Sequence, residues 1–184
     1  MMGRHYRGQE AMQQLAWRQA NKKQARQLSA QRGARGDATN SAIELASTLT
    51  PAMIEATMLP YRHAAKRLRE GVATEDEHAI VWTMVLIAQG IERSSVIRGL
   101  AEHLLAARSA LDAVAARALS SGAWHAVPLE FCEIDVITDA IEFHQVQLQV
   151  VSRRELHEIA ARLINQRVAA GDQVRRITLQ EALS

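Results

Sequence analysis

The chain has 184 residues, of which 48% are hydrophobic and 4% aromatic, and its net charge is +2. Its single cysteine, Cys132, excludes an internal disulfide and a cysteine-rich zinc site, so we expect a reducing compartment, the cytoplasm. Three prolines and nine glycines are few interruptions for this length, which favours long helices. We therefore predict an all-α fold with one folded domain of four to five helices.

The charge is distributed unevenly along the chain. Residues 1–36 contain eight basic residues and one acidic residue, a charge of +7, whereas the other residues contain 14 basic and 19 acidic residues, a charge of −5. Clustered Lys and Arg attract phosphates without sequence preference. We predict a basic arm, residues 1–36, that contacts nucleic acid, DNA or RNA. The residues expected to make this contact are Arg18, Lys22, Lys23, Arg26, Arg32 and Arg35.

The charge of the basic arm is also compatible with roles that involve no nucleic acid. The arm suits docking on an acidic protein surface, or a solvated segment with no partner. An Arg-rich, acid-poor start is in addition typical of an organelle transit peptide.

After a polar linker, residues 37–49, we expect a helical domain over residues 50–171 and a tail over residues 172–184. Thr50 and Pro51 form a typical helix start, because the hydroxyl caps free N–H groups and proline tolerates the first helical position. Pro60 is expected to interrupt this helix, and a basic helix then continues over residues 61–70.

The most apolar stretch is Ala79 to Ile91, which follows a capping box formed by Thr74 and Glu77. A helix that is apolar all round is normally buried among other helices. At 13 residues the stretch is shorter than the roughly 20 needed to span a bilayer. We predict the central helix of the bundle here, with no membrane contact, and an end or kink at Gly90.

The longest helical pattern runs from about Ser94 to Ser120, with apolar residues spaced alternately by three and four. This seam packs either within the chain or across a homodimer, and the pattern does not choose between them. For the homodimer we predict an interface formed by Ile97, Leu100, Leu104, Leu111 and Val114.

Two further helices are expected in the last third of the domain. Ile134 to Val151 has helical spacing, although residues 144–150 also alternate as a strand would, and we favour the helix. Ser152 and Glu155 form a second capping box that starts the last helix.

An acidic segment lies in the first of these two helices. Residues 129–151 contain no Lys or Arg, and the acidic side chains are Glu130, Glu133, Asp135, Asp139 and Glu142. The simple interpretation is a solvated face. The alternative is a docking surface for the basic arm of this or another subunit, which would compete with nucleic acid.

A helix-turn-helix is a further candidate at Gln89 to Leu100, with Gly90 as the turn glycine. Its groove-facing residues would be Arg93, Ser94, Ser95 and Arg98. Against this interpretation, Leu86 occupies a position where a small residue is usual, and the following helix is longer than a recognition helix.

Patterns that indicate catalysis are weak. Glu75 and His78 form one Glu-x-x-His pair, whereas carboxylate-bridged metal bundles need two such pairs and two more acids. His144 lies on an apolar stripe, where a hydrogen-bonded core histidine is the simpler interpretation. We therefore expect no metal, no cofactor and no enzymatic activity. A metal-dependent helical enzyme is the third hypothesis, after a nucleic-acid-binding regulatory protein and a protein–protein interaction module.

Three motifs give a resemblance to known proteins: LPYRHAAKRLREG at Leu59 to Gly71, ATEDEH at Ala73 to His78 and SRREL at Ser152 to Leu156. Over about residues 58–171 the chain resembles small all-helical bacterial proteins sometimes described as Fis-type transcriptional regulators. The resemblance implies a helical regulatory protein. Fis-type regulators end in a DNA-binding helix-turn-helix, and no such pattern follows Gly122, so no functional residue is transferred from them.

Overall fold

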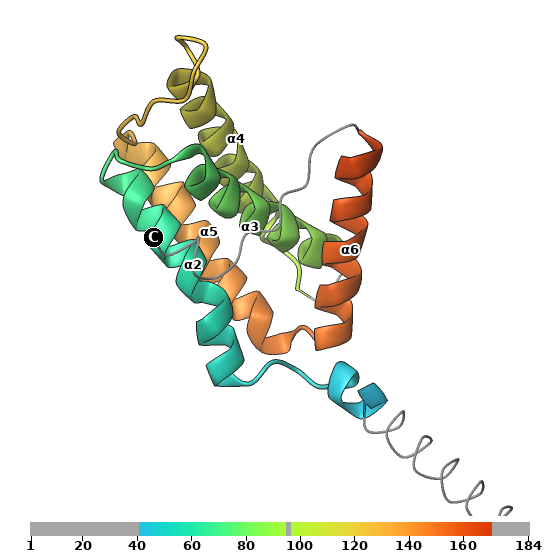
Figure 1. Cartoon of the computed structure of the whole chain (residues 1–184). Helices are drawn as coiled ribbons and strands as arrows, with labels where there is room; N and C mark the ends of the chain where they lie inside the picture. Colours follow the sequence, from blue (N-terminus) through green and yellow to red (C-terminus); the bar gives the residue numbers. More distant parts are fainter. Residues whose placement is uncertain (1–40, 95–96, 171–184) are drawn as a thin grey trace, which may run out of the picture. The chain divides into compact units, whose positions relative to one another are not determined.

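The computed structural model describes residues 41–94 and 97–170 (Figure 1). The helices of this part of the chain are α2 (Pro51–Arg69), α3 (Glu75–Arg93), α4 (Ala101–Ala118), α5 (Phe131–Val150) and α6 (Arg153–Ala169). Residues 41–46 are also helical. The predicted all-α helical bundle is confirmed.

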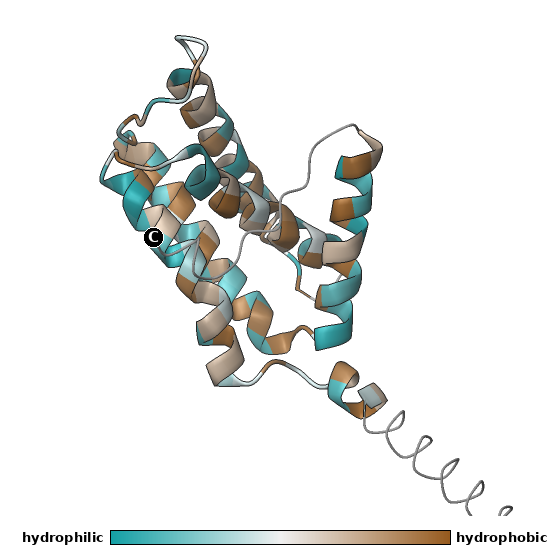
Figure 2. Cartoon of the chain, viewed as in Figure 1, coloured by the Kyte–Doolittle hydropathy of each residue, from teal (hydrophilic) through white to brown (hydrophobic). Residues whose placement is uncertain are grey.

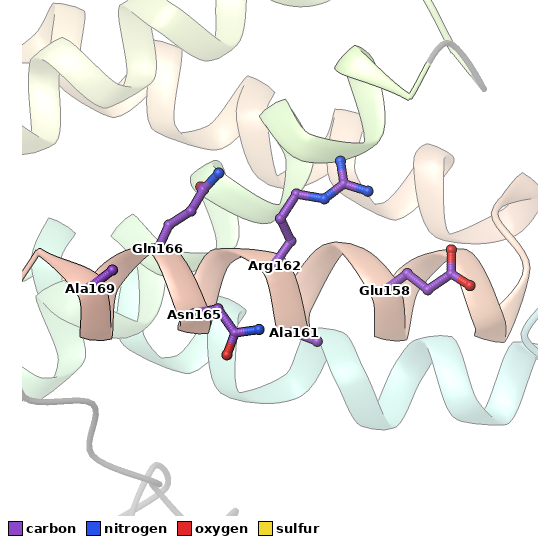
Figure 3. Close-up of a pocket in the computed structure, with 6 residues that line it drawn as sticks. All are labelled: Glu158, Ala161, Arg162, Asn165, Gln166 and Ala169. Atoms are coloured by element: carbon purple, nitrogen blue, oxygen red, sulfur yellow. The ribbon is translucent and has the colours of Figure 1, made fainter.

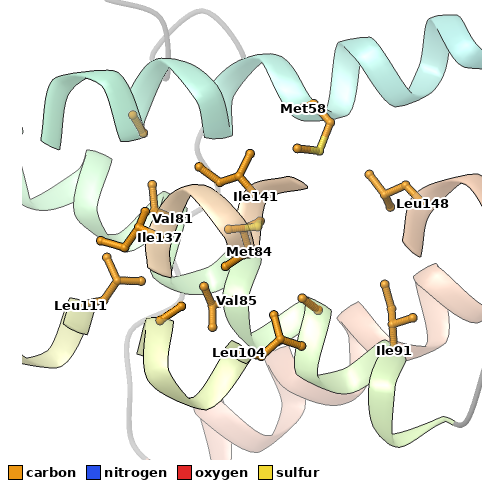
Figure 4. Close-up of a cluster of buried hydrophobic side chains, with 14 of the residues drawn as sticks. Met58, Val81, Met84, Val85, Ile91, Leu104, Leu111, Ile137, Ile141 and Leu148 are labelled. Carbon is orange, nitrogen blue, oxygen red and sulfur yellow. The ribbon is translucent and has the colours of Figure 1, made fainter. Parts of the chain in front are cut away.

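Helix α3 is the centre of the body, as the apolar stretch Ala79 to Ile91 predicts. It contacts α2, α4, α5 and α6, whereas α6 contacts α3 alone among the described helices. Figure 4 shows the shared core, in which Met58 of α2, Met84 of α3 and Leu148 of α5 are fully buried. Figure 2 shows that hydrophobic and hydrophilic residues alternate around the outer helices. No described helix is long and apolar enough to cross a bilayer.

The predicted helix starts are confirmed at three positions. Thr50 accepts a hydrogen bond from the Met53 N–H at 3.3 Å. Thr74 with Glu77, and Ser152 with Glu155, form complete capping boxes in which each partner satisfies a free N–H of the other.

The prediction that Pro60 interrupts the helix is wrong, because α2 runs unbroken from Pro51 to Arg69 with Pro60 inside it. Proline removes one helical hydrogen bond and costs about 3 kcal/mol in a helix interior. The buried residues of α2 lie on both sides of the proline, namely Ile54, Met58, Ala64 and Leu68. Burial of these side chains in one core offsets the lost bond.

The prediction of an end or kink at Gly90 is also wrong, because α3 continues through Gly90 to Arg93. The glycine instead permits close packing: a Cβ at this position would lie 2.5 Å from Cγ2 of Ile159 in α6. The helix-turn-helix prediction fails for the same reason, because its turn glycine is inside a helix.

Helix α4 begins at Ala101, later than the predicted Ser94, because Glu92 caps it from α3. The Glu92 carboxylate accepts hydrogen bonds from the N–H groups of Gly99, at 2.8 Å, and Leu100, at 3.1 Å. Gly99 has a φ of +98°, which glycine adopts without strain. These bonds hold the residues just before α4 against the end of α3.

The segment 37–49, predicted as a linker, is partly structured. Residues 41–46 are helical, and Leu49 belongs to the core with 7% of its surface exposed. The backbone of Ser47 accepts a hydrogen bond from Arg153 N–H at 3.0 Å. The folded body therefore begins before Thr50. Residues 144–150, whose pattern is compatible with both a helix and a strand, belong to α5. The predicted helix is therefore confirmed there.

Candidate functional site

A groove with a volume of about 420 Å³ lies between α2 and α5 and is lined by residues of both helices. The apolar residues that line it are buried or half-buried, so they form a floor: Ala65 of α2, Leu129 before α5, and Ile134, Ile137 and Ile141 of α5. Its volume lies within the range of about 300 to 1,000 Å³ that is common for ligand sites.

One rim of the groove is basic. It is formed by Arg62, Lys66 and Arg69, which lie on one side of α2 at helical spacing. Arg62 donates hydrogen bonds to Glu55, at 2.8 Å, and to Gln145 of α5, at 2.9 Å. Lys66 lies 3.8 Å from Glu70, and Arg69 forms no ion pair with any described residue. This row of three, the α2 basic row, is exposed to solvent.

The opposite rim is polar, with Thr138, Glu142 and Gln145 of α5. Beyond it, the exposed face of α5 carries Asp135 and Asp139. These two side chains and Glu142 form no ion pair with described residues. The surface is therefore electrically asymmetric, with cations on α2 and carboxylates on α5.

Two residues of the predicted acidic segment, Glu130 and Glu133, have a structural role in the fold. Glu133 is 5% exposed, and its carboxylate accepts hydrogen bonds of 2.6 and 2.7 Å from the guanidinium of Arg117 in α4. The bonds to Arg117 hold the pKa of Glu133 below its usual value. Glu133 also accepts the N–H of Glu130 at 2.8 Å, which completes the capping box of α5. These two acids fix α5 against α4.

The two histidines considered for chemistry are part of the packing. His144 is 1% exposed, lies 3.4 Å from the Gln147 side chain through Nδ1, and has a pKa lowered to about 4 by burial. Tyr61 packs edge-on against its ring. His78 Nε2 lies 2.9 Å from the carbonyl oxygen of Leu111, and burial lowers its pKa. Within the described residues, no three metal-binding side chains come together.

A second, larger hollow of about 580 Å³ follows the outer side of α6 (Figure 3). All its lining residues belong to that one helix, namely Glu158, Ala161, Arg162, Asn165, Gln166 and Ala169. Within the part of the chain that the structure describes, no second element lines it, so this hollow is the outward surface of α6.

Most residues of the predicted dimer interface pack against helices of their own chain. Leu104, Leu111 and Val114 are at most 1% exposed and belong to the core, which corrects their assignment to a subunit contact. Leu100 is partly buried against the same core, and Ile97 is half-buried. The seam therefore packs against α3 and α5 of its own chain.

The residues predicted to bind nucleic acid lie outside the described part of the chain, as do the rest of residues 1–36. Of the groove-facing residues of the rejected helix-turn-helix, Arg93, Ser94 and Arg98 are exposed near the end of α3, and Ser95 is outside the described residues.

The groove itself was not predicted from the sequence. Its walls come from segments about 70 residues apart in the sequence, and only the basic character of residues 61–70 indicates one of them. The Arg117–Glu133 pair was missed for the same reason, since the two residues belong to different helices.

No protein-family model matches the chain, and neither curated proteins nor solved structures include a match. The resemblance to Fis-type regulators therefore stays a prediction.

Proposed function

We propose that the protein is a non-enzymatic binding protein with a regulatory role, whose basic arm contacts nucleic acid with little sequence preference. The observation that carries the proposal is the charge of +7 on residues 1–36 beside a body of −5. Such a segment neutralises phosphates and releases their counterions, which makes the affinity depend steeply on salt.

The chemistry of the body supports a binding role over catalysis. His144 and His78, two of the six histidines in the described part of the chain, are held in the core by packing and hydrogen bonds. Glu77 and Glu133, the buried acids, accept hydrogen bonds from Arg67 and Arg117 and from capped helix starts. These groups stabilise helix contacts, so they are not free to act on a substrate.

The test is a salt titration of binding to a duplex of mixed sequence, measured by fluorescence anisotropy. Replacing all six predicted contact residues of the arm by Gln should abolish binding. If all six contact phosphates, the slope of log K against log salt for the wild type should be about −5. A matched control replaces the three cations of the α2 basic row by Gln, which should leave most of the affinity. Absence of binding at low salt would reject the proposal.

A protein–protein interaction module is the second candidate, and the α2–α5 groove favours it. Its apolar floor and charged rims fit a peptide segment better than a phosphate backbone. The protein partner would then bind the body and not the arm.

A further inference from the structure

Our inference concerns the α2–α5 groove and does not depend on nucleic-acid binding by the arm. We propose that this groove is a docking site for an acidic amphipathic peptide segment of a partner protein. The segment would place apolar side chains on the isoleucine floor and carboxylates against the α2 basic row.

The floor determines what kind of group the groove accepts. Ile137 and Ile141 are already buried in the core, at 2% and 9% exposure, so the apolar surface still open to a partner belongs to the half-buried Ala65, Leu129 and Ile134. Apolar surface of this kind is stabilised by covering it with other apolar groups. A phosphate backbone offers none, and the described residues that line the groove include no aromatic side chain on which a base would stack.

The rims determine the charge of the occupant. Arg62, Lys66 and Arg69 extend over about 10 Å, since a helix rises 1.5 Å per residue. Arg69 has no carboxylate partner among the described residues, and exposed pairs such as Lys66–Glu70 contribute little. Arg69 and Lys66 can therefore bind carboxylates of a partner with little internal loss, whereas Arg62 would have to exchange its hydrogen bonds to Glu55 and Gln145.

The α5 rim gives the occupant an orientation. Glu142 lines the groove opposite the cations, and Asp135 and Asp139 lie exposed on the same helix. These carboxylates repel an acidic edge, so the acids of the segment should face α2 while neutral or basic residues face α5. Helix-in-groove recognition commonly combines an apolar face with charged edges in this way.

The experiment selects binders from a displayed library of random peptides of about 12 residues, roughly three helical turns. The full chain is the target, and the variant R62E/K66E/R69E is the comparison. We expect enriched peptides with apolar residues three or four apart and at least one acidic edge. Synthesised peptides should bind the triple variant about tenfold or more weakly by fluorescence anisotropy. The control variant R154E/R162E, with changes at exposed cations of α6, should bind them unchanged.

A second variant tests the groove without changing charge. Thr138 is exposed at the α5 rim, so Thr138→Trp should fill the groove and weaken peptide binding by about tenfold or more. Circular dichroism checks the helicity of each variant. If the triple variant loses helicity, Arg69→Glu alone replaces it, because this side chain forms no ion pair with any described residue.

Three results would overturn the inference: no enrichment on the wild type over the triple variant, equal peptide affinity for both proteins, or peptides that retain affinity for Thr138→Trp. Loss of duplex binding in the triple variant without any peptide effect would assign the α2 basic row to phosphate contact instead. The arm variant separates the two proposals, because it should lose nucleic acid and keep the peptides.

Discussion

Ile159 of α6 lies so close to Gly90 of α3 that a Cβ on the glycine would be 2.5 Å from the isoleucine Cγ2. Ile159 is the buried residue of α6, at 5% exposure. The contact between these two residues is therefore a backbone-level packing contact of α6 on α3, beside the partly buried Leu156 and Leu163.

Gly90→Ala should destabilise the protein although it replaces glycine inside a helix. Alanine favours the helix by about 1 kcal/mol, but overpacking against Ile159 costs about 1 to 3 kcal/mol, so we expect a net loss of up to about 2 kcal/mol. Urea unfolding measures it. Thr83→Ala, at an exposed position of α3, is the control and should be nearly neutral. In the double mutant with Ile159→Ala the glycine substitution should lose most of its cost, whereas simple additivity would contradict the proposed clash.

Truncation of two adjacent leucines of α4 should change the free energy of unfolding by very different amounts. Leu104 is fully buried, so Leu104→Ala should lower the free energy of unfolding by about 2 to 5 kcal/mol. Leu105 is 58% exposed, and Leu105→Ala should change stability by less than about 0.5 kcal/mol. Thermal unfolding and light scattering together check both variants. A loss of subunit association with unchanged stability in Leu104→Ala would restore the predicted dimer seam.

Removal of Arg117 should cost more than removal of an exposed arginine. Arg117→Ala removes the guanidinium from the buried Glu133 carboxylate. We expect a loss of about 1 to 3 kcal/mol, limited because Arg117 itself is partly exposed and its removal lets water reach the carboxylate. The control Arg154→Ala removes an exposed pair with Glu158 and should have little effect. Glu133→Gln in the Arg117→Ala background should recover part of the loss, since it removes the unpaired charge.

As the pH is lowered, the free energy of unfolding should begin to fall before the carboxylates take up protons. The pKa of His144 falls from 6.5 to about 4 on folding, so the unfolded chain binds this proton first and stability falls as the pH drops from about 6.5 to about 4. The loss from His144 approaches about 3 kcal/mol. Glu133 and Glu155, whose pKa values are lowered, add a loss only below about pH 4.5.

The variant His144→Leu tests this interpretation. It should flatten the dependence of the free energy of unfolding on pH between about 6.5 and 4.5, as measured by urea titration at each pH. His78, whose pKa is also lowered, should leave a smaller residual slope. An unchanged slope in His144→Leu would show that another group carries the effect.

Local chemistry made much of the fold predictable. The hydroxyls of Thr50, Thr74 and Ser152 begin helices where their spacing to the next acid or proline indicates, because caps act within one turn. The apolar character of Ala79 to Ile91 likewise identifies the helix that all the others contact.

The failures have a common physical cause, which is distance along the chain. Gly90 resembles a terminator until its partner Ile159, 69 residues later, is known. Pro60 resembles a breaker until both halves of α2 are seen to share a core. The heptad seam of α4 has the same pattern whether its partner is α3 or a second copy. The groove was invisible because α2 and α5 are separated by two helices.

The attachment of α6 gives the protein two levels of stability. The helices α2 to α5 each contact at least two others, so none can leave without opening the core, whereas among α2 to α5 the helix α6 contacts only α3 and contributes one buried side chain, besides the hydrogen bond from Arg153 N–H to Ser47. Its detachment would uncover the strip of α3 around Gly90 and free Arg167 from the ring of Trp82, 4.0 Å away, while the other four helices stay packed. Amide hydrogens of α6 should therefore exchange with solvent through a local opening, at rates set by one helix contact and independent of global unfolding.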